Sequence, residues 1–65
     1  MNKTIYVSYM SKDNMYLFEE IKMPNNSGMS ISEYCQSLPN YRSNLKVYLS
    51  KEQMNESMNQ LLNQL

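Results

Sequence analysis

Apolar and polar residues alternate from Lys3 to Met10, which predicts a strand. One face is apolar, with Ile5, Val7 and Tyr9. The other face carries Thr4, Tyr6 and Ser8. β-Branched and aromatic residues favour the pleated backbone of a strand. The segment Ser11–Asn14 follows, and an asparagine tolerates the left-handed conformation that a three-residue hairpin loop needs. We therefore expect the chain to reverse direction there.

The next segment, Met15–Met23, fits two structures. As a strand it places Leu17 and Ile21 on one face, where Glu19 interrupts the apolar pattern. As a helix capped by Asp13 it gathers Leu17 and Ile21 on one stripe with Phe18. The strand is favoured, because turn residues precede the segment and aromatic residues prefer strands. The two segments then form a hairpin.

A short resemblance bears on this choice. The stretch Ile5–Asn14 resembles the opening strand and loop of TIR domains, in which an apolar strand ends in a Ser-Tyr pair and a Ser/His-Lys-Asp stretch follows. The resemblance implies a helix after the loop, so it favours the helical alternative for Met15–Met23. It covers about ten of the 65 residues, and a TIR domain is more than twice this long. The sequence assigns no family to the chain as a whole.

The second half of the chain predicts a helix, a strand and a longer helix. Pro24–Gly28 contains the only glycine and predicts a loop. Ser30 and Glu33 form a capping box for a short helix that Pro39 stops. Alternation predicts a third strand over residues 45–49, and Ser50 with Gln53 predicts a second capping box. The helix from Lys51 to the C-terminus has an apolar stripe of one buried face's width, made by Met54, Met58, Leu61, Leu62 and Leu65.

This order predicts a small α+β domain over residues 1–65. We expect a two-layer sandwich with ββαβα order, a three-stranded sheet in order 2-1-3, and both helices on one face. The inner face would hold Ile5, Val7, Tyr9, Leu17, Ile21, Leu45, Val47 and Leu49. The outer face would hold Tyr6, Tyr16, Phe18 and Tyr48, together with Glu20, Lys22 and Lys46.

Composition excludes most catalytic chemistry. The chain has no histidine, and its six basic residues balance six acidic ones. Nucleophilic catalysis and metal binding usually use histidine or clustered cysteines, so we expect a protein that is not an enzyme, with no cofactor and no metal. We expect the single Cys35 to be a small buried apolar residue. A lone cysteine cannot form an internal disulfide, so it predicts a cytoplasmic protein. No apolar run is long enough to predict a membrane span.

The aromatic residues of the outer face are the strongest functional signal. Large aromatic side chains gathered on one surface are typical of binding sites. We therefore predict a partner-binding site made of Tyr6, Tyr16, Phe18 and Tyr48. The same residues also fit ordinary cross-strand pairing that stabilises the sheet. An abundance of Asn, Ser, Met and Tyr without alanine is common in small proteins of AT-rich bacteria and their phages, which indicates a viral or mobile-element accessory protein that sterically inhibits a host protein.

Two other functions remain open. One is a small homodimeric regulator that contacts nucleic acid through Lys3, Lys12, Lys22, Arg42, Lys46 and Lys51. Zero net charge argues against nucleic acid, because phosphate binding depends on clustered basic residues. The other is a structural or assembly subunit. A chain this short has a thin core, so a homodimer is the expected assembly.

Overall fold

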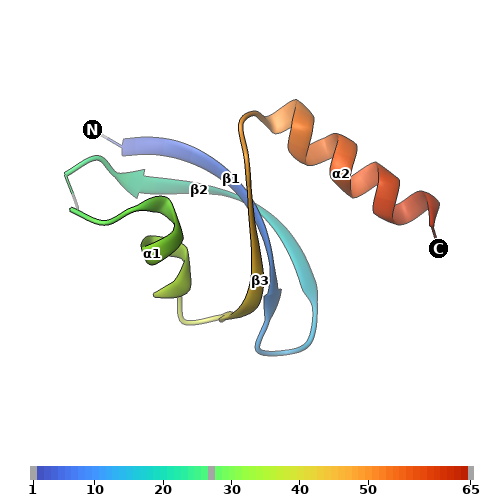
Figure 1. Cartoon of the computed structure of the whole chain (residues 1–65), viewed down its shortest axis with the longest axis horizontal. Coiled ribbons are helices and arrows are strands. Elements are labelled where there is room, and N and C mark those ends of the chain that lie inside the picture. The colour runs from blue at the N-terminus through green and yellow to red at the C-terminus, as the bar shows by residue number, and fades with distance from the viewer. Residues whose placement is uncertain (1, 27, 65) are drawn as a thin grey trace.

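The computed structural model describes residues 2–26 and 28–64 of the chain. These residues form three strands and two helices (Figure 1). In chain order they are β1 (Asn2–Ser11), β2 (Tyr16–Pro24), α1 (Ile31–Gln36), β3 (Tyr41–Tyr48) and α2 (Lys51–Asn63). The ββαβα order predicted from the alternation of residues is confirmed.

β1 and β2 form an antiparallel hairpin whose pairing runs without irregularity from Asn2 opposite Pro24 to Met10 opposite Tyr16. At the turn, Ser11 N–H donates to the carbonyl of Met15 at 2.8 Å. Asn14 has φ 63°, the left-handed conformation that the loop needs. Met15–Met23 is therefore extended, and the helical alternative, together with the TIR-like continuation, is wrong.

β3 pairs antiparallel with the other edge of β1, so the sheet order β2-β1-β3 and the α+β class are confirmed. β3 spans Tyr41–Tyr48 rather than residues 45–49. The register shifts between Ser8 and Ser11 of β1, and Asn44 of β3 has φ 62°. An extra residue in a left-handed conformation is typical of a β-bulge, and the bulge hides the alternation in the first half of β3. Leu49 lies past the end of β3 and is 89% exposed, so its expected inner-face position is wrong.

Both helices begin at a serine cap. At α1, Glu33 N–H donates to Ser30 Oγ at 3.1 Å, and Ser30 N–H donates to the Glu33 carboxylate at 3.5 Å, so this capping box is confirmed. At α2, Gln53 N–H donates to Ser50 Oγ at 3.3 Å. The Gln53 side chain accepts instead from the backbone N–H of Leu49. Ser50 is therefore confirmed as the cap of α2, but Gln53 bonds to the residue before that cap, and the second capping box predicted from Ser50 and Gln53 is wrong.

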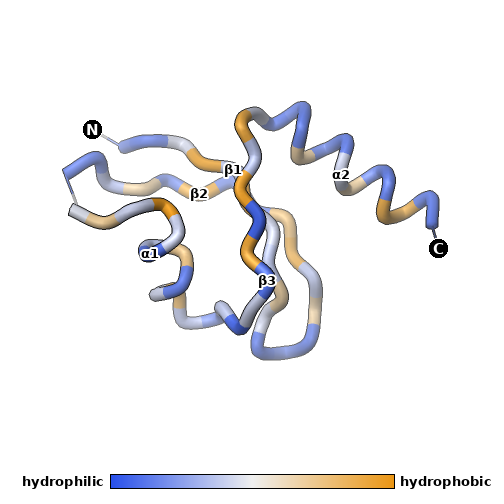
Figure 2. Tube along the Cα trace, viewed as in Figure 1, coloured by the Kyte–Doolittle hydropathy of each residue, from blue (hydrophilic) through white to orange (hydrophobic). Residues whose placement is uncertain are grey.

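α1 covers one face of the sheet and forms the main core with it. Its Cys35 is buried against the buried residues Ile5, Val7, Tyr9 and Met23. Leu17, Ile21 and Leu45 pack at the edge of this cluster, as the inner-face prediction requires, whereas Val47 is 45% exposed. Figure 2 shows hydrophobic and hydrophilic positions alternating along β3, as expected for a strand with one covered face.

α2 packs against the opposite face, so the expected placement of both helices on one face is wrong. Successive side chains of a strand point to opposite faces, and Ser8 therefore faces away from the α1 core that holds Val7. Ser8 Oγ lies 2.9 Å from the Tyr48 hydroxyl, which donates to Ser57 Oγ of α2 at 3.1 Å. Figure 1 shows the two helices on opposite sides of the strands. Since both faces of this small sheet carry large side chains, each face takes one helix.

α2 is held mainly through its first half. Met54 is 6% exposed and Met58 is half-buried, whereas Leu61 is 37% and Leu62 58% exposed. The last member of the predicted stripe, Leu65, lies outside the described residues. The stripe therefore changes along the helix from packing against the sheet to facing solvent.

Met54→Ala should lower the free energy of unfolding by about 2–5 kcal/mol, because it leaves a cavity between α2 and the sheet. Leu62→Ala, on the same stripe but exposed, should change it by less than about 0.5 kcal/mol. Urea denaturation followed by circular dichroism measures both. Equal effects of the two substitutions would contradict this packing of α2.

Candidate functional site

Three of the four predicted site residues form one aromatic cluster on the α2 face of the sheet. Tyr16 meets Phe18 edge to face, with ring centroids 5.3 Å apart. Phe18 stacks on Tyr48 at 6.4 Å, although the two rings come from the two outer strands. Tyr6 lies directly opposite Tyr48 in the register, so it shares the face. The hairpin register and the β1–β3 pairing together produce this cluster.

A chain of hydroxyl groups holds the cluster in place. Buried Ser8 Oγ lies 3.0 Å from the Tyr16 hydroxyl and 2.9 Å from that of Tyr48. One arrangement of hydrogens satisfies every group: Tyr16 donates to Ser8, Ser8 to Tyr48, and Tyr48 to Ser57 of α2. Successive hydroxyl bonds of this kind strengthen one another in a buried setting. These hydroxyl bonds orient both tyrosines and fix α2 over them.

The candidate site is a groove between α2 and this aromatic cluster. Its volume is about 260 Å³. Its lining comes from β2, β3, α2 and the residue that caps the end of α2: Tyr16, Phe18, Lys46, Ser57, Gln60, Leu61 and Gln64. Aromatic rings and Leu61 form the apolar part, and Lys46 with the two glutamines forms a polar rim. We call this hollow the α2 groove.

The predicted site residues have unequal positions in the α2 groove. Tyr16 is 38% exposed and lines it with half-buried Phe18. Tyr6 and Tyr48 are half-buried and do not line it. The role of all four in binding a partner stays a prediction. Sequence reasoning missed Leu61 as a site residue, because it placed Leu61 in the covered stripe of α2, whereas Leu61 is 37% exposed and lines the groove.

The α1 face holds a tyrosine–carboxylate pair, made by buried Tyr9 and half-buried Glu19. The Tyr9 hydroxyl donates to the Glu19 carboxylate. Burial, then this bond and the charge of Glu19, raise the pKa of Tyr9 to about 12. Burial, with a smaller effect of Glu19, also raises the pKa of the Cys35 thiol, so the thiol stays protonated. Glu19, which breaks the apolar pattern of β2, is thus explained by its bond to Tyr9.

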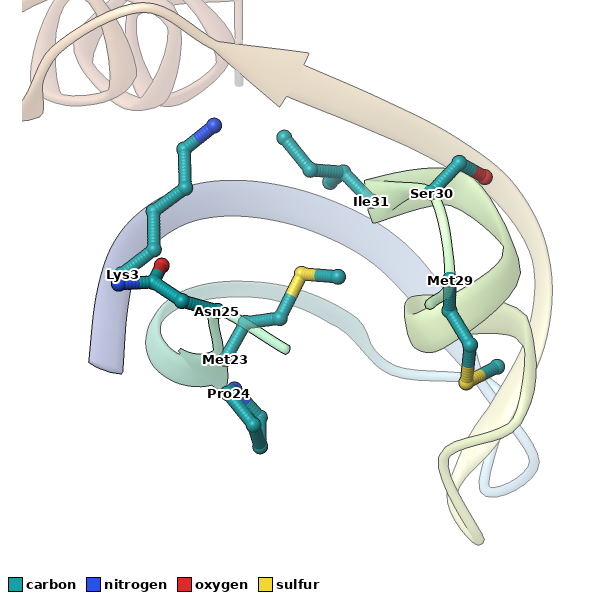
Figure 3. A pocket seen from close by; sticks show the side chains of 7 residues that line it. All are labelled: Lys3, Met23, Pro24, Asn25, Met29, Ser30 and Ile31. Atoms are coloured by element: carbon teal, nitrogen blue, oxygen red, sulfur yellow. The ribbon is translucent and has the colours of Figure 1, made fainter. Parts of the chain in front are cut away.

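Two other hollows lie on the α1 side of the sheet. One, of about 500 Å³, borders Tyr9 and the outer edge of β2, and its lining includes Ile21, Leu38 and Pro39. The other, of about 280 Å³, lies where the loop after β2 meets the start of α1. Figure 3 shows its lining: Lys3, Met23, Pro24, Asn25, Met29, Ser30 and Ile31. Within residues 2–26 and 28–64, no three His, Cys, Asp or Glu side chains gather as a metal site would need.

Comparisons of the chain with protein-family models, curated proteins and solved structures find no match. In the part of the chain that the structure describes, no helix has the length and apolarity to cross a membrane. Since no comparison gives a match, the function of the α2 groove is inferred from its own residues and their geometry.

The phenol of Tyr9 should titrate at a higher pH than that of an ordinary tyrosine. Because the folded-state pKa of Tyr9 is raised from 10.0 to about 12, its contribution to stability is complete below pH 10 and is lost as pH rises toward 12. Absorbance titration of tyrosinate should show this late step, and Tyr9→Phe should remove it. Identical late titration in parent and variant would contradict the assignment.

Proposed function

We propose that this chain is a non-enzymatic protein-binding module that acts sterically, through the α2 groove. In this proposal it is a cytoplasmic accessory protein of phage or mobile-element origin that occupies the surface of a host protein and blocks it. The observation that carries the proposal is the shared lining of one groove by Tyr16, Phe18 and Leu61. Aromatic rings beside an exposed aliphatic side chain, surrounded by polar groups, resemble the centre and rim of a protein interface.

The rim of the α2 groove indicates the chemistry of the partner. Lys46 supplies a positive charge at one side, and Gln60 of α2 and Gln64 at its C-cap supply amide donors and acceptors. A complementary protein segment would present an apolar side chain to the aromatic rings and a neighbouring carboxylate to Lys46. Opposite charges at the rim of an interface favour the correct partner and its orientation.

The bonded hydroxyl groups fix the shape of the α2 groove before a partner binds. Tyr16, the most exposed ring of the cluster, is tied at its hydroxyl to buried Ser8. Binding therefore costs little additional ordering of this side chain, and rigid aromatic contacts of this kind contribute strongly to affinity. The aromatic cluster stabilises the sheet and also presents a fixed edge to a partner.

The alternative, a homodimeric nucleic-acid-binding regulator, stays a prediction. Its basic residues lie on separate features of the fold. Lys3 lines the hollow at the start of α1, Arg42 donates to the Asn14 side chain of the hairpin loop, and Lys46 lines the α2 groove. No contact among the described residues gathers them, so we favour a protein partner.

Tyr16→Ala and Leu61→Ala should each weaken partner binding by about tenfold or more, because each removes an anchor from the groove. Leu49→Ala is the matched control, since Leu49 is more exposed but does not line the groove. The measurement is capture of a stoichiometric protein from bacterial lysate by each variant, followed by titration of the captured protein.

Melting curves of Leu61→Ala and Leu49→Ala should stay close to that of the parent, whereas Tyr16→Ala loses its contact with Phe18 and its bond to Ser8 and should melt at a lower temperature. The proposal fails if no stoichiometric protein is captured, or if Leu49→Ala weakens binding as much as the groove substitutions do.

A further inference from the structure

The two outer strands of the sheet have different free edges. β3 carries two register shifts and the left-handed Asn44, and such bulges blunt an edge against pairing with another strand. β2 pairs with β1 without irregularity from Tyr16 to Pro24. The sheet order leaves its other side without a strand among the described residues. A long regular edge of this kind is a template for a further strand.

The hairpin shows which backbone groups of this edge are free. Ser11 N–H bonds to the carbonyl of Met15, so this pair is a hydrogen-bonded one. Hydrogen-bonded pairs alternate along an antiparallel ladder, which means that Glu19 and Ile21 direct their backbone groups toward β1. The even positions from Phe18 to Lys22 direct theirs outward. Pro24 also lies at an outward position. Its backbone nitrogen carries no hydrogen, and at this position no hydrogen bond to β1 is lost.

We propose that the free edge of β2 pairs antiparallel with β2 of a second copy of this chain, about a two-fold axis that passes Ile21. This register places Glu20 of each copy opposite Lys22 of the other, at positions whose backbone groups point outward. The two charge pairs form together because the interface is symmetric. Opposite charges directly across two strands stabilise the pairing, whereas like charges oppose it.

Neighbouring registers lack this complementarity. An axis at Glu20 would place two Glu20 carboxylates opposite each other, and an axis at Glu19 would do the same for Glu19. An axis at Lys22 would oppose two ammonium groups. In a continued sheet, residues directly opposite each other lie on the same face, so an even position can oppose only another even position. Of the axes from Glu19 to Lys22, the axis at Ile21 is therefore the one that pairs opposite charges.

The surroundings of the edge fit the same arrangement. Lys22 Nζ donates to Thr4 Oγ1 at 2.6 Å, a neutral partner that leaves the ammonium charge uncompensated. The exposed Glu20 carboxylate has no side-chain partner within residues 2–26 and 28–64. On the α1 face, the hollow of about 500 Å³ that Ile21 and Leu38 line borders this edge. A second copy would bring another Ile21 against its rim.

The proposal is independent of the α2 groove, and charge reversal tests it. Lys22→Glu and Glu20→Lys should each weaken the dimer about tenfold or more, because each places like charges across the two-fold axis. A mixture of the two variants should form a heterodimer, since the two carboxylates of the first variant then face the two ammonium groups of the second. Sedimentation velocity over a concentration series measures all three. Lys51→Glu, a charge reversal away from β2, is the control and should dimerise like the parent.

Cross-linking tests the register. Ile21→Cys should form an intermolecular disulfide under mild oxidation, because residues on the axis form a close non-hydrogen-bonded pair. Met15→Cys, exposed before the start of β2, should not. The parent, whose only thiol is buried Cys35, should also remain uncross-linked. A parent that is monomeric at about 100 μM would overturn the proposal. A dimer that survives both charge reversals, or cross-links equally through Met15→Cys, would do the same.

Discussion

The structure depends on β1, because this central strand contributes to both faces of the sheet and pairs with both other strands. It lies between β2 and β3, so both hydrogen-bond ladders of the described sheet run through its backbone. Its odd positions, among them Val7, enter the α1 core, and buried Ser8 faces α2. A chain of 65 residues has too little apolar surface for two separate cores. Sharing one strand between two packing layers lets both helices contribute to a single cooperative unit.

The two faces of β1 use different physical means. The α1 face is held by apolar contact and includes one polar pair, Tyr9 with Glu19. The α2 face is held by directional hydroxyl bonds from Ser8 through Tyr48 to Ser57, supported by Met54. Apolar contact tolerates small shifts, whereas hydroxyl bonds require particular distances and angles. The face with the candidate site is therefore the one whose geometry is more sharply defined.

The sequence predicts local structure here better than long-range placement. The hairpin loop with Asn14 and the Ser30 cap follow from the backbone preferences of single residues, so both could be foreseen. The stripe of α2 shows that one side of the helix is covered, but it does not say which face of the sheet covers it. The partner of Ser8 at Tyr48 is 40 positions away, and nothing local indicates it. The bulge at Asn44 removes the alternation by which the start of β3 would be recognised.

Cys35 gives this fold an internal reporter. Its side chain is fully buried between α1, to which it belongs, and the sheet, and burial raises the pKa of its thiol, so both restricted access and low ionisation protect it from alkylating reagents. A reagent in solution reaches the sulfur only when α1 separates from the sheet. The rate of modification then measures how often this layer opens, in the way that amide exchange measures local opening. Because the described chain has this one thiol, the signal comes from a single place in the core.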